Sequence, residues 1–262
     1  MKFYVRGGIG DFLQSSWFIK NNSNQQFIVH THFDGAELFF KNLGVKNVSF
    51  YHFKNTEEHD AQADKILVDH GENSTTNIKE CPRSFYSSVD LFDDFEAEAK
   101  DFVKKFSEVK QIIGIHPFGS SFSSNVYTKF NLPVKFIPSE IVKNIINPDF
   151  NYIIFGKKEE LDSYGIEESG NILHTNLSIE GCLELVKRCY KFIGTDSGFK
   201  TMSSMRRIPT FCTLGDFEDY LRDSLFINQY EKDGVMQVFK YTDLSEKHEA
   251  LLDSLNLFLQ EQ

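Results

Sequence analysis

Two glycine-bearing segments, far apart in the chain, constrain what it can fold into. The first, Arg6–Asp11, follows an apolar run at 3–5 and opens an amphipathic stretch. The second, Gly194–Gly198, follows the apolar pair at 192–193 and opens another. Both are typical of the turn between a parallel strand and a helix, where open α/β sheets place their ligands. Because each half of the chain carries one such turn with an aspartate, we expect a cleft between two nucleotide-type domains.

The rest of the chain alternates between strand-like and helix-like patterns. Apolar runs predict strands at 3–5, 27–30, 48–51, 66–69, 111–116, 152–155, 192–194 and 209–214. Apolar residues at helical spacing predict helices at 11–20, 34–43, 92–106, 138–147, 178–190 and 246–259. Such alternation favours parallel sheets covered by helices on both faces. We therefore expect an α/β fold of two Rossmann-like domains, residues 1–110 and residues 111–262.

Composition excludes several classes of protein. The 262 residues carry a formal net charge of −10, which argues against a general nucleic-acid or anionic-membrane binder. No run approaches ~18 uncharged apolar residues, and the N-terminus lacks a secretory pattern, so no transmembrane segment is expected. The four cysteines form no Cys-x-x-Cys pair, and His30 and His32 have no third ligand at metal spacing. These features predict a reduced, cytoplasmic protein without a metal or cofactor.

The first glycine turn carries residues suited to phosphate and proton chemistry. Gly7, Gly8 and Gly10 permit close approach of a ligand to backbone amides at a helix N-terminus. Leu13 stands where a dinucleotide fingerprint has its third glycine, so NAD binding is not expected. Asp11, at the tip of the turn, suits a general base, which must lie within hydrogen-bond reach of the hydroxyl it deprotonates. Its alternative role is to cap the first helix.

The second turn suits a pyrophosphate. Ser197, Gly198 and the amides after them open a helix whose N-terminus favours phosphate charge. Asp196 would then face sugar hydroxyls, because a carboxylate repels a phosphate; a structural turn capped by Asp196 is the alternative. Lys200 is a candidate for neutralising the phosphate. No Asp-x-Asp stands in a setting that suggests a divalent ion, which favours amides and lysines as the diphosphate ligands.

Four motifs follow one another in the chain: GGIGDFLQSS, IGIHPFGSS, IIFGKKEE and IGTDSGFKTMSSMRRIPTF. In this order they resemble the ADP-heptose-type lipopolysaccharide heptosyltransferases of glycosyltransferase family 9. The resemblance covers the C-terminal half well and the N-terminal half mainly in its first twenty residues. It implies the two-Rossmann architecture called GT-B, with the last helix, at 246–259, returning to the first domain.

The resemblance also implies roles for single residues. Asp11 would be the general base, Lys129 would neutralise the leaving diphosphate, and Glu160 would accept hydrogen bonds from the ribose. The plainer alternatives are a solvated loop lysine at Lys129 and an exposed helix surface at Glu160. Two departures stand out: Thr201 occupies the position of a family histidine, and the family's Lys-x-Trp-Pro segment has become the KFNLP of residues 129–133.

The sequence thus predicts a metal-independent, inverting glycosyltransferase. It would move a heptose-like sugar from a nucleotide-diphosphate donor, an ADP-sugar by the resemblance, to a glycan or lipid-linked acceptor. Two alternatives stay open: a nucleotide-sugar epimerase or hydrolase on the same fold, and a degenerate, non-catalytic carbohydrate-binding relative. The polar segment 70–83 is where acceptor contacts or a lid are expected. The sequence does not specify the base, the sugar, the acceptor or the oligomeric state.

Overall fold

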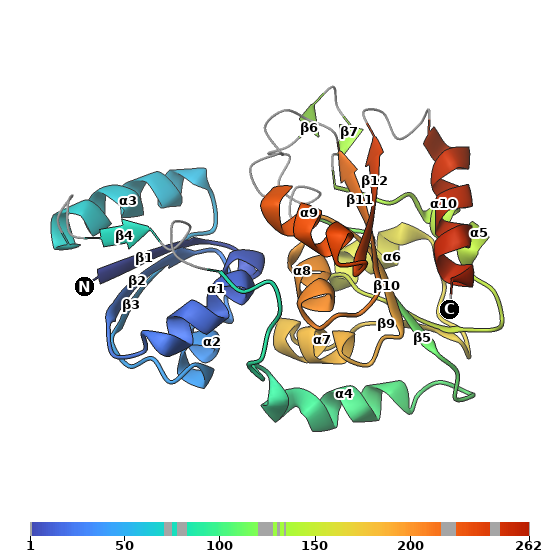
Figure 1. Ribbon diagram of the computed structural model, residues 1–262, viewed down its shortest axis with the longest axis horizontal. Helices are drawn as coiled ribbons and strands as arrows, with labels where there is room; N and C mark the ends of the chain where they lie inside the picture. The colour runs from blue at the N-terminus through green and yellow to red at the C-terminus, as the bar shows by residue number, and fades with distance from the viewer. Residues whose placement is uncertain are drawn as a thin grey trace. The chain divides into compact units, whose positions relative to one another are not determined.

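The computed structural model describes residues 2–70, 75–77, 83–119, 128–129, 132–133, 135–215, 224–241 and 247–261 (Figure 1). At 56, 75–77, 128–129, 132–133 and 224–225 it describes the backbone alone. The chain forms two compact units, Met1–Asp93 and Asp94–Gln262. The division lies ahead of helix α4 (Glu96–Val103), which packs on α7 (Ile179–Val186) in the second unit. The boundary expected at residue 110 would have left α4 in the first unit.

The first unit contains a parallel four-stranded sheet in the order β3-β2-β1-β4. Its elements are β1 (Lys2–Gly7), α1 (Ile9–Asn21), β2 (Gln26–Thr31), α2 (Ala36–Asn42), β3 (Val48–His52), α3 (Thr56–His70) and β4 (Thr75–Asn77). Helices α1 and α2 cover one face and α3 covers the other (Figure 1). Successive side chains of a strand point to opposite faces of the sheet, so β2 contacts helices on both sides. Its Phe27 contacts Phe40 of α2, while its His30 stacks on His59 of α3.

The second unit contains a parallel six-stranded sheet in the order β12-β11-β10-β5-β8-β9. Its strands are β5 (Ile112–His116), β8 (Asn151–Ile154), β9 (Ile172–His174), β10 (Lys191–Thr195), β11 (Thr210–Gly215) and β12 (Met236–Tyr241). A separate antiparallel pair joins β6 (Thr128–Lys129) to β7 (Leu132–Pro133). The chain builds β5, β8 and β9 outward, then returns to place β10 beside β5. This is the Rossmann order, with its switch point between β5 and β10.

Helices bury both faces of the second sheet. They are α5 (Ser139–Ile145), α6 (Lys158–Tyr164), α7, α8 (Gly198–Met205), α9 (Ser224–Lys232) and α10 (His248–Gln260). Ile113 and Ile115 of β5 share a core with α5 and α10. On the other face, Phe155 contacts Phe199 of α8 at 5.3 Å between ring centroids. Figure 1 shows α5 and α10 on one side of the sheet and α7 and α8 on the other. Strands buried on both faces are continuously apolar, which made most of them predictable.

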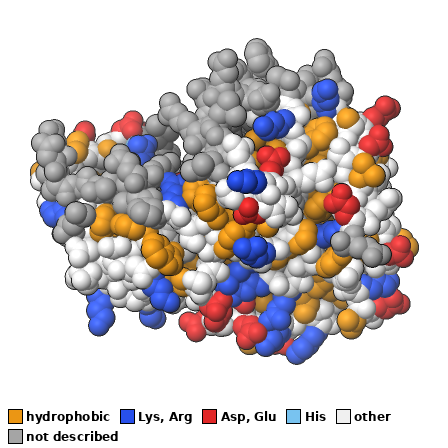
Figure 2. Space-filling view, viewed as in Figure 1, with side chains coloured by type: hydrophobic (Ala, Val, Ile, Leu, Met, Phe, Trp, Pro, Cys, Tyr) orange, Lys and Arg blue, Asp and Glu red, His pale blue; other side chains and the backbone are white. Residues whose placement is uncertain are grey.

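Helix α4 lies on the surface of the second unit and carries both signs of charge. Glu96 pairs with Lys100 at 2.8 Å and with Arg188 at 2.9 Å, and Asp101 pairs with Lys104 at 2.7 Å. Figure 2 shows side chains of both signs of charge gathered along the lower edge of the second unit in this view. Interspersed charges of this kind are typical of a solvated helix face.

Two predictions of local structure are wrong. Residues 66–69, expected to be a strand, form the last turns of α3. The last helix, expected to return to the first domain, instead packs in the second unit, where Leu251, Leu255 and Phe258 of α10 belong to the core with Ile113 of β5. Among the described elements, the helix α9 and the strands β4, β6, β7, β9 and β12 were not predicted. Helix α3 was expected only as the strand at 66–69, and a helix at α6 was considered only as the alternative for Glu160.

Candidate functional site

The second glycine turn lies at the switch point of the six-stranded sheet. His116 ends β5, Thr195 ends β10, and Gly194 is paired in register with His116. Asp196 and Ser197 follow directly, and α8 begins at Gly198. Open α/β sheets bind ligands at the carboxyl ends of the strands at this point. The turn predicted to bind pyrophosphate therefore has the expected place in its own sheet.

Ser197 joins the start of α8 to β5. Its Oγ accepts a hydrogen bond from the Lys200 backbone N–H at 3.3 Å and lies 3.1 Å from His116 Nδ1. Burial lowers the pKa of His116 to about 3, so the imidazole is neutral. The same ring packs on Phe199, with centroids 4.4 Å apart. These contacts fix the N-terminus of α8, whose partial positive charge suits an anionic ligand.

Asp196 lies between two lysines. Its Oδ1 is 2.8 Å from Lys200 Nζ, and its Oδ2 is 3.0 Å from Lys135 Nζ. Burial opposes ionisation of Asp196, but the two ammonium groups outweigh it and hold the pKa of the carboxyl below its ordinary value. Burial also works against the charge of Lys200, yet the Asp196 carboxylate raises the pKa of Lys200. Among the described side chains of this cluster, two cations outnumber one anion, and this net positive charge favours a diphosphate.

Lys135 was missed by the sequence analysis, although a signal for it exists. The family segment Lys-x-Trp-Pro was matched to residues 129–133, where the lysine and the proline are four positions apart. Lys135 and Pro138 keep the three-position spacing, and Pro138 directly precedes α5. The structure places the Lys135 ammonium beside Asp196, whereas the side chain of Lys129 lies outside the described residues.

Two other positions that the sequence analysis singled out in the second unit, Glu160 and Thr201, make hydrogen bonds to nearby backbone groups. Glu160 Oε2 accepts a hydrogen bond from the Lys157 N–H at 2.8 Å, which caps α6. Thr201, at the family's histidine position, is buried in α8, and its Oγ1 donates to the Ser197 carbonyl at 3.2 Å. A ribose contact by Glu160 stays a prediction.

The first glycine turn lies at the carboxyl end of β1, at the switch point between β1 and β4. Gly8 is the N-cap of α1, and its N–H donates to Asp11 Oδ2 at 3.2 Å. Gly7 has φ +137°, and a Cβ there would lie 2.0 Å from Asp11 Oδ2. Gly10 lies within the first turn of the helix rather than in a loop. Asp11 thus caps α1 at the edge where open α/β sheets bind ligands.

Arg83, the last residue of the polar segment expected to form acceptor contacts, also lies at this edge, although the sequence pattern did not single it out. Its Nη2 is 4.0 Å from Asp11 Oδ1, and its Nη1 donates to Gln14 Oε1 at 2.7 Å. Of the segment expected to form acceptor contacts or a lid, residues 71–74 and 78–82 lie outside the described residues.

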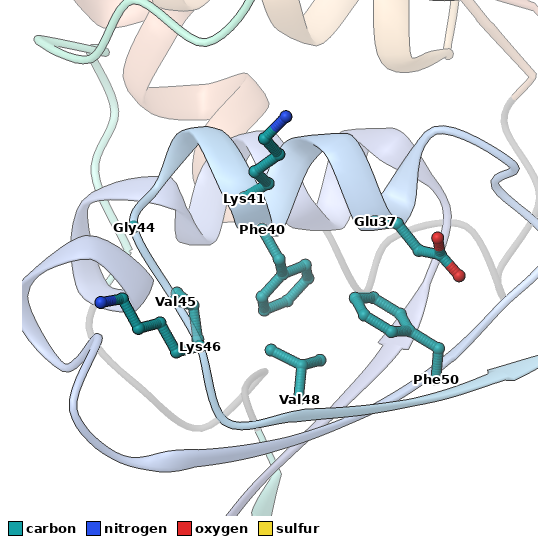
Figure 3. A pocket seen from close by; sticks show the side chains of 8 residues that line it. All are labelled: Glu37, Phe40, Lys41, Gly44, Val45, Lys46, Val48 and Phe50. Atoms are coloured by element: carbon teal, nitrogen blue, oxygen red, sulfur yellow. The ribbon is translucent and has the colours of Figure 1, made fainter.

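A shallow pocket of about 260 Å³ lies elsewhere in the first unit, between α2 and β3. Figure 3 shows Phe40, Val48 and Phe50 pointing toward one another in it, while the amine ends of Lys41 and Lys46 point away. None of the candidate residues lines this pocket.

Metal centres and membrane spans are both absent from the described residues. Among them, no group of three or more His, Cys, Asp or Glu side chains could hold a metal ion. No helix in the same ranges has the length and apolar character needed to cross a membrane.

Two Rossmann-like units, each with a glycine turn at its switch point, define the GT-B class of fold. Solved glycosyltransferases share this fold over nearly the whole chain. The glycosyltransferase family 9 structure from Veillonella parvula DSM 2008 aligns with a TM-score of 0.59 at 9% identity, covering 95% of this chain and 88% of its own. The E. coli ADP-heptose lipopolysaccharide heptosyltransferase II aligns with a TM-score of 0.60 at 13% identity, covering 99% and 98%.

A third structure, the E. coli heptosyltransferase WaaC with ADP, aligns with a TM-score of 0.52 at 10% identity, covering 98% of this chain and all of its own. No protein-family model and no curated protein sequence matches the chain. The predicted fold class, two Rossmann-like domains of the GT-B type, is confirmed. The cleft expected between them stays a prediction.

Proposed function

We propose that this protein is an inverting glycosyltransferase. It moves a heptose-like sugar from a nucleoside-diphosphate donor, ADP-sugar in the first instance, to a hydroxyl of a glycan or lipid-linked acceptor. The observation that carries the proposal is the positive edge formed by Lys135, Lys200 and the N-terminus of α8 at the switch point of the second sheet. The fold shared with heptosyltransferases, one of them solved with ADP, supports the choice of donor.

In the proposed reaction, Asp11 takes the proton of the acceptor hydroxyl as its oxygen attacks the anomeric carbon. The bond between that carbon and the β-phosphate oxygen breaks, and its electron pair leaves with the nucleoside diphosphate. The sugar is then joined to the acceptor with inverted configuration. Lys135, Lys200 and the amides following Ser197 stabilise the charge on the departing diphosphate, so the reaction needs no divalent ion. Asp196 orients both lysines, and a contact between Asp196 and the sugar hydroxyls stays a prediction.

Product analysis tests this function. The protein is incubated with ADP-heptose and a candidate glycan acceptor in buffer containing EDTA, and free ADP and the glycoside are measured. Transfer requires that ADP appear only when the acceptor is present, in step with the glycoside. ADP release without acceptor would indicate a hydrolase, and a new sugar isomer an epimerase. Ligand binding without either product would indicate the degenerate carbohydrate-binding relative.

The Asp11→Asn variant tests the proposed base. We expect turnover to fall by ~10²–10⁴-fold, the range for loss of a positioned general base, with donor affinity almost unchanged. The amide retains an oxygen that accepts the hydrogen bond from Gly8, so the melting temperature should change little. Steady-state rates at saturating donor and a melting curve provide the measurement. Near-full turnover in the variant would leave Asp11 as a helix cap only.

A further inference from the structure

A buried arginine faces the carboxylate of Asp11. The Arg83 side chain is only 9% exposed, and that of Asp11 is 19% exposed. The two residues lie far apart in the chain, yet Arg83 Nη2 comes within 4.0 Å of Asp11 Oδ1. A buried guanidinium requires partners for its donors, so this placement reflects a specific environment rather than a chance surface contact.

Gln14 fixes the guanidinium from the next turn of α1. Its side-chain Oε1 accepts a hydrogen bond from Arg83 Nη1 at 2.7 Å, and its backbone carbonyl accepts one from the Ser84 N–H at 3.1 Å. Residues 83 and 84 are therefore attached to α1 at two points. The planar fork of arginine lets one nitrogen bond Gln14 while the other faces Asp11, a geometry that lysine cannot reproduce.

The two oxygens of Asp11 have different surroundings. Oδ2 accepts the N–H of Gly8, while Oδ1 faces Arg83 at a distance longer than a direct hydrogen bond. At 4.0 Å the guanidinium attracts the carboxylate without a short bond to Oδ1. His32 is a further titratable neighbour, because its ring lies 3.4 Å from where a Cβ of Gly8 would stand.

We propose that Arg83 is the positioning residue of Asp11: anchored by Gln14, its guanidinium holds the Asp11 carboxylate ionised and in one orientation for proton abstraction. This inference rests on the proposed function, in which Asp11 is the base. Arg83 acts through Asp11 and does not itself touch the reacting atoms. Its removal therefore alters turnover and its pH dependence rather than donor affinity.

A double-mutant cycle tests whether Arg83 acts through Asp11. In the wild-type background, Arg83→Gln should lower turnover by about 10-fold to 100-fold, the cost of a misplaced catalytic group, with donor KM unchanged. In the Asp11→Asn background the same change should cost less than about 2-fold, because the group it positions is already gone. Equal losses in both backgrounds would overturn the proposal. Lys20→Gln, an exposed charge removal on the same helix, serves as the matched control.

The pH dependence of turnover distinguishes the effect of the Arg83 charge from the effect of its forked geometry. In Arg83→Gln the acid limb of the pH–rate profile should move up by about 1 pH unit, because a cation no longer favours the carboxylate. Arg83→Lys keeps the charge without the fork, so its acid limb should stay near that of the wild type while turnover falls. Melting curves of both variants verify that they are folded.

The carboxyl titration of Asp11, followed by carbon NMR, does not depend on activity. Its midpoint should also rise by about 1 pH unit in Arg83→Gln and stay unchanged in Lys20→Gln. An unchanged midpoint in Arg83→Gln would overturn the positioning role. If the wild-type protein showed no transfer while the midpoint moved as expected, the proposed function would fail and the Arg83–Asp11 coupling would stand.

Discussion

At the scale of single residues, the second unit has a carboxylate held between two ammonium groups. Lys200 is almost fully buried, with 5% of its side chain exposed, and depends on Asp196 to offset the loss of hydration. Lys135 is more accessible, at 14%. We therefore expect Lys200 and Asp196 to stabilise the start of α8, and Lys135, the more accessible lysine, to make the larger contribution to binding the proposed diphosphate.

Replacing Asp196 with alanine should therefore destabilise the second unit. We expect Asp196→Ala to lower the free energy of unfolding by about 3 kcal/mol, because it leaves Lys200 as a buried, unpaired charge. The stabilisation is present above the ordinary Asp pKa of 3.8 and lost as the pH falls below it, since the folded state holds this pKa lower. Urea unfolding followed by circular dichroism provides the measurement.

The control is Asp162→Ala, which breaks the exposed pair between Lys158 and Asp162. That change should cost less than about 0.5 kcal/mol. Equal costs for the two variants would show that the Asp196 pair is as well solvated as a surface ion pair, contrary to the burial of Lys200.

Single residues also show which parts of the candidate site can be predicted from the sequence and which cannot. Ser197 and Gly198 lie at the start of a helix as predicted, because a strand followed by a Gly-bearing turn has few other solutions. Lys135 was missed because a lysine near a proline is common, and only the folded chain shows which ammonium reaches Asp196. Arg83 belongs to the polar segment 70–83, but nothing local distinguishes it there, since its partner Asp11 lies seventy-two positions away in the sequence.

At the scale of elements, strands buried on both faces were predictable and amphipathic or short ones were not. In strand β12, at the sheet edge, Gln237 and Lys240 interrupt the apolar residues. Strand β9 has only three residues, too few to show a period. Residues 66–69 were misassigned because Ile66, Leu67 and Val68 are consecutive. In α3 they point in different directions, and only Ile66 is buried, while Val68 is 84% exposed.

The C-terminal end of α10 depends on one buried lysine. Lys191 Nζ donates to the Phe258 carbonyl at 2.6 Å and to the Leu259 carbonyl at 3.3 Å, and also contacts the Glu261 carbonyl. We expect Lys191→Met to cost about 2 kcal/mol, because it leaves buried helix-end carbonyls without donors. Hydrogen exchange should speed up in the last turns of α10 but not in α1. Unchanged exchange in α10 would show that apolar packing alone holds this helix.

At the scale of the whole molecule, each unit buries a histidine in the neutral form. Burial lowers the pKa of His30 to about 4 and that of His116 to about 3, both below the ordinary value of 6.5. The unfolded chain therefore binds more protons than the folded one below pH 6.5. Stability is fully present above that value and falls as the pH decreases toward 4 in the first unit and toward 3 in the second.

From pH 7 to about pH 5, the free energy of unfolding of the first unit should fall by about 2 kcal/mol through His30. Trp17, the single tryptophan of the chain, lies on α1 of this unit and reports its unfolding by fluorescence. The His30→Gln variant should lose most of this pH dependence. If the variant and the wild type respond equally to acid, other groups govern the acid sensitivity.

The fluorescence of Trp17 also allows the melting of the first unit to be followed separately in a ligand-binding experiment. ADP at about 100 times its Kd should stabilise the unit that binds it by about 2.7 kcal/mol. Since the proposed diphosphate ligands Lys135, Ser197 and Lys200 all lie in the second unit, ADP should raise the melting transition seen by circular dichroism. The Trp17 fluorescence transition, which reports the first unit, should stay in place. Lys135→Ala should remove most of the shift, and comparison with GDP, UDP and CDP identifies the base. A shift confined to Trp17 fluorescence would place the nucleotide in the first unit and contradict the proposed donor site.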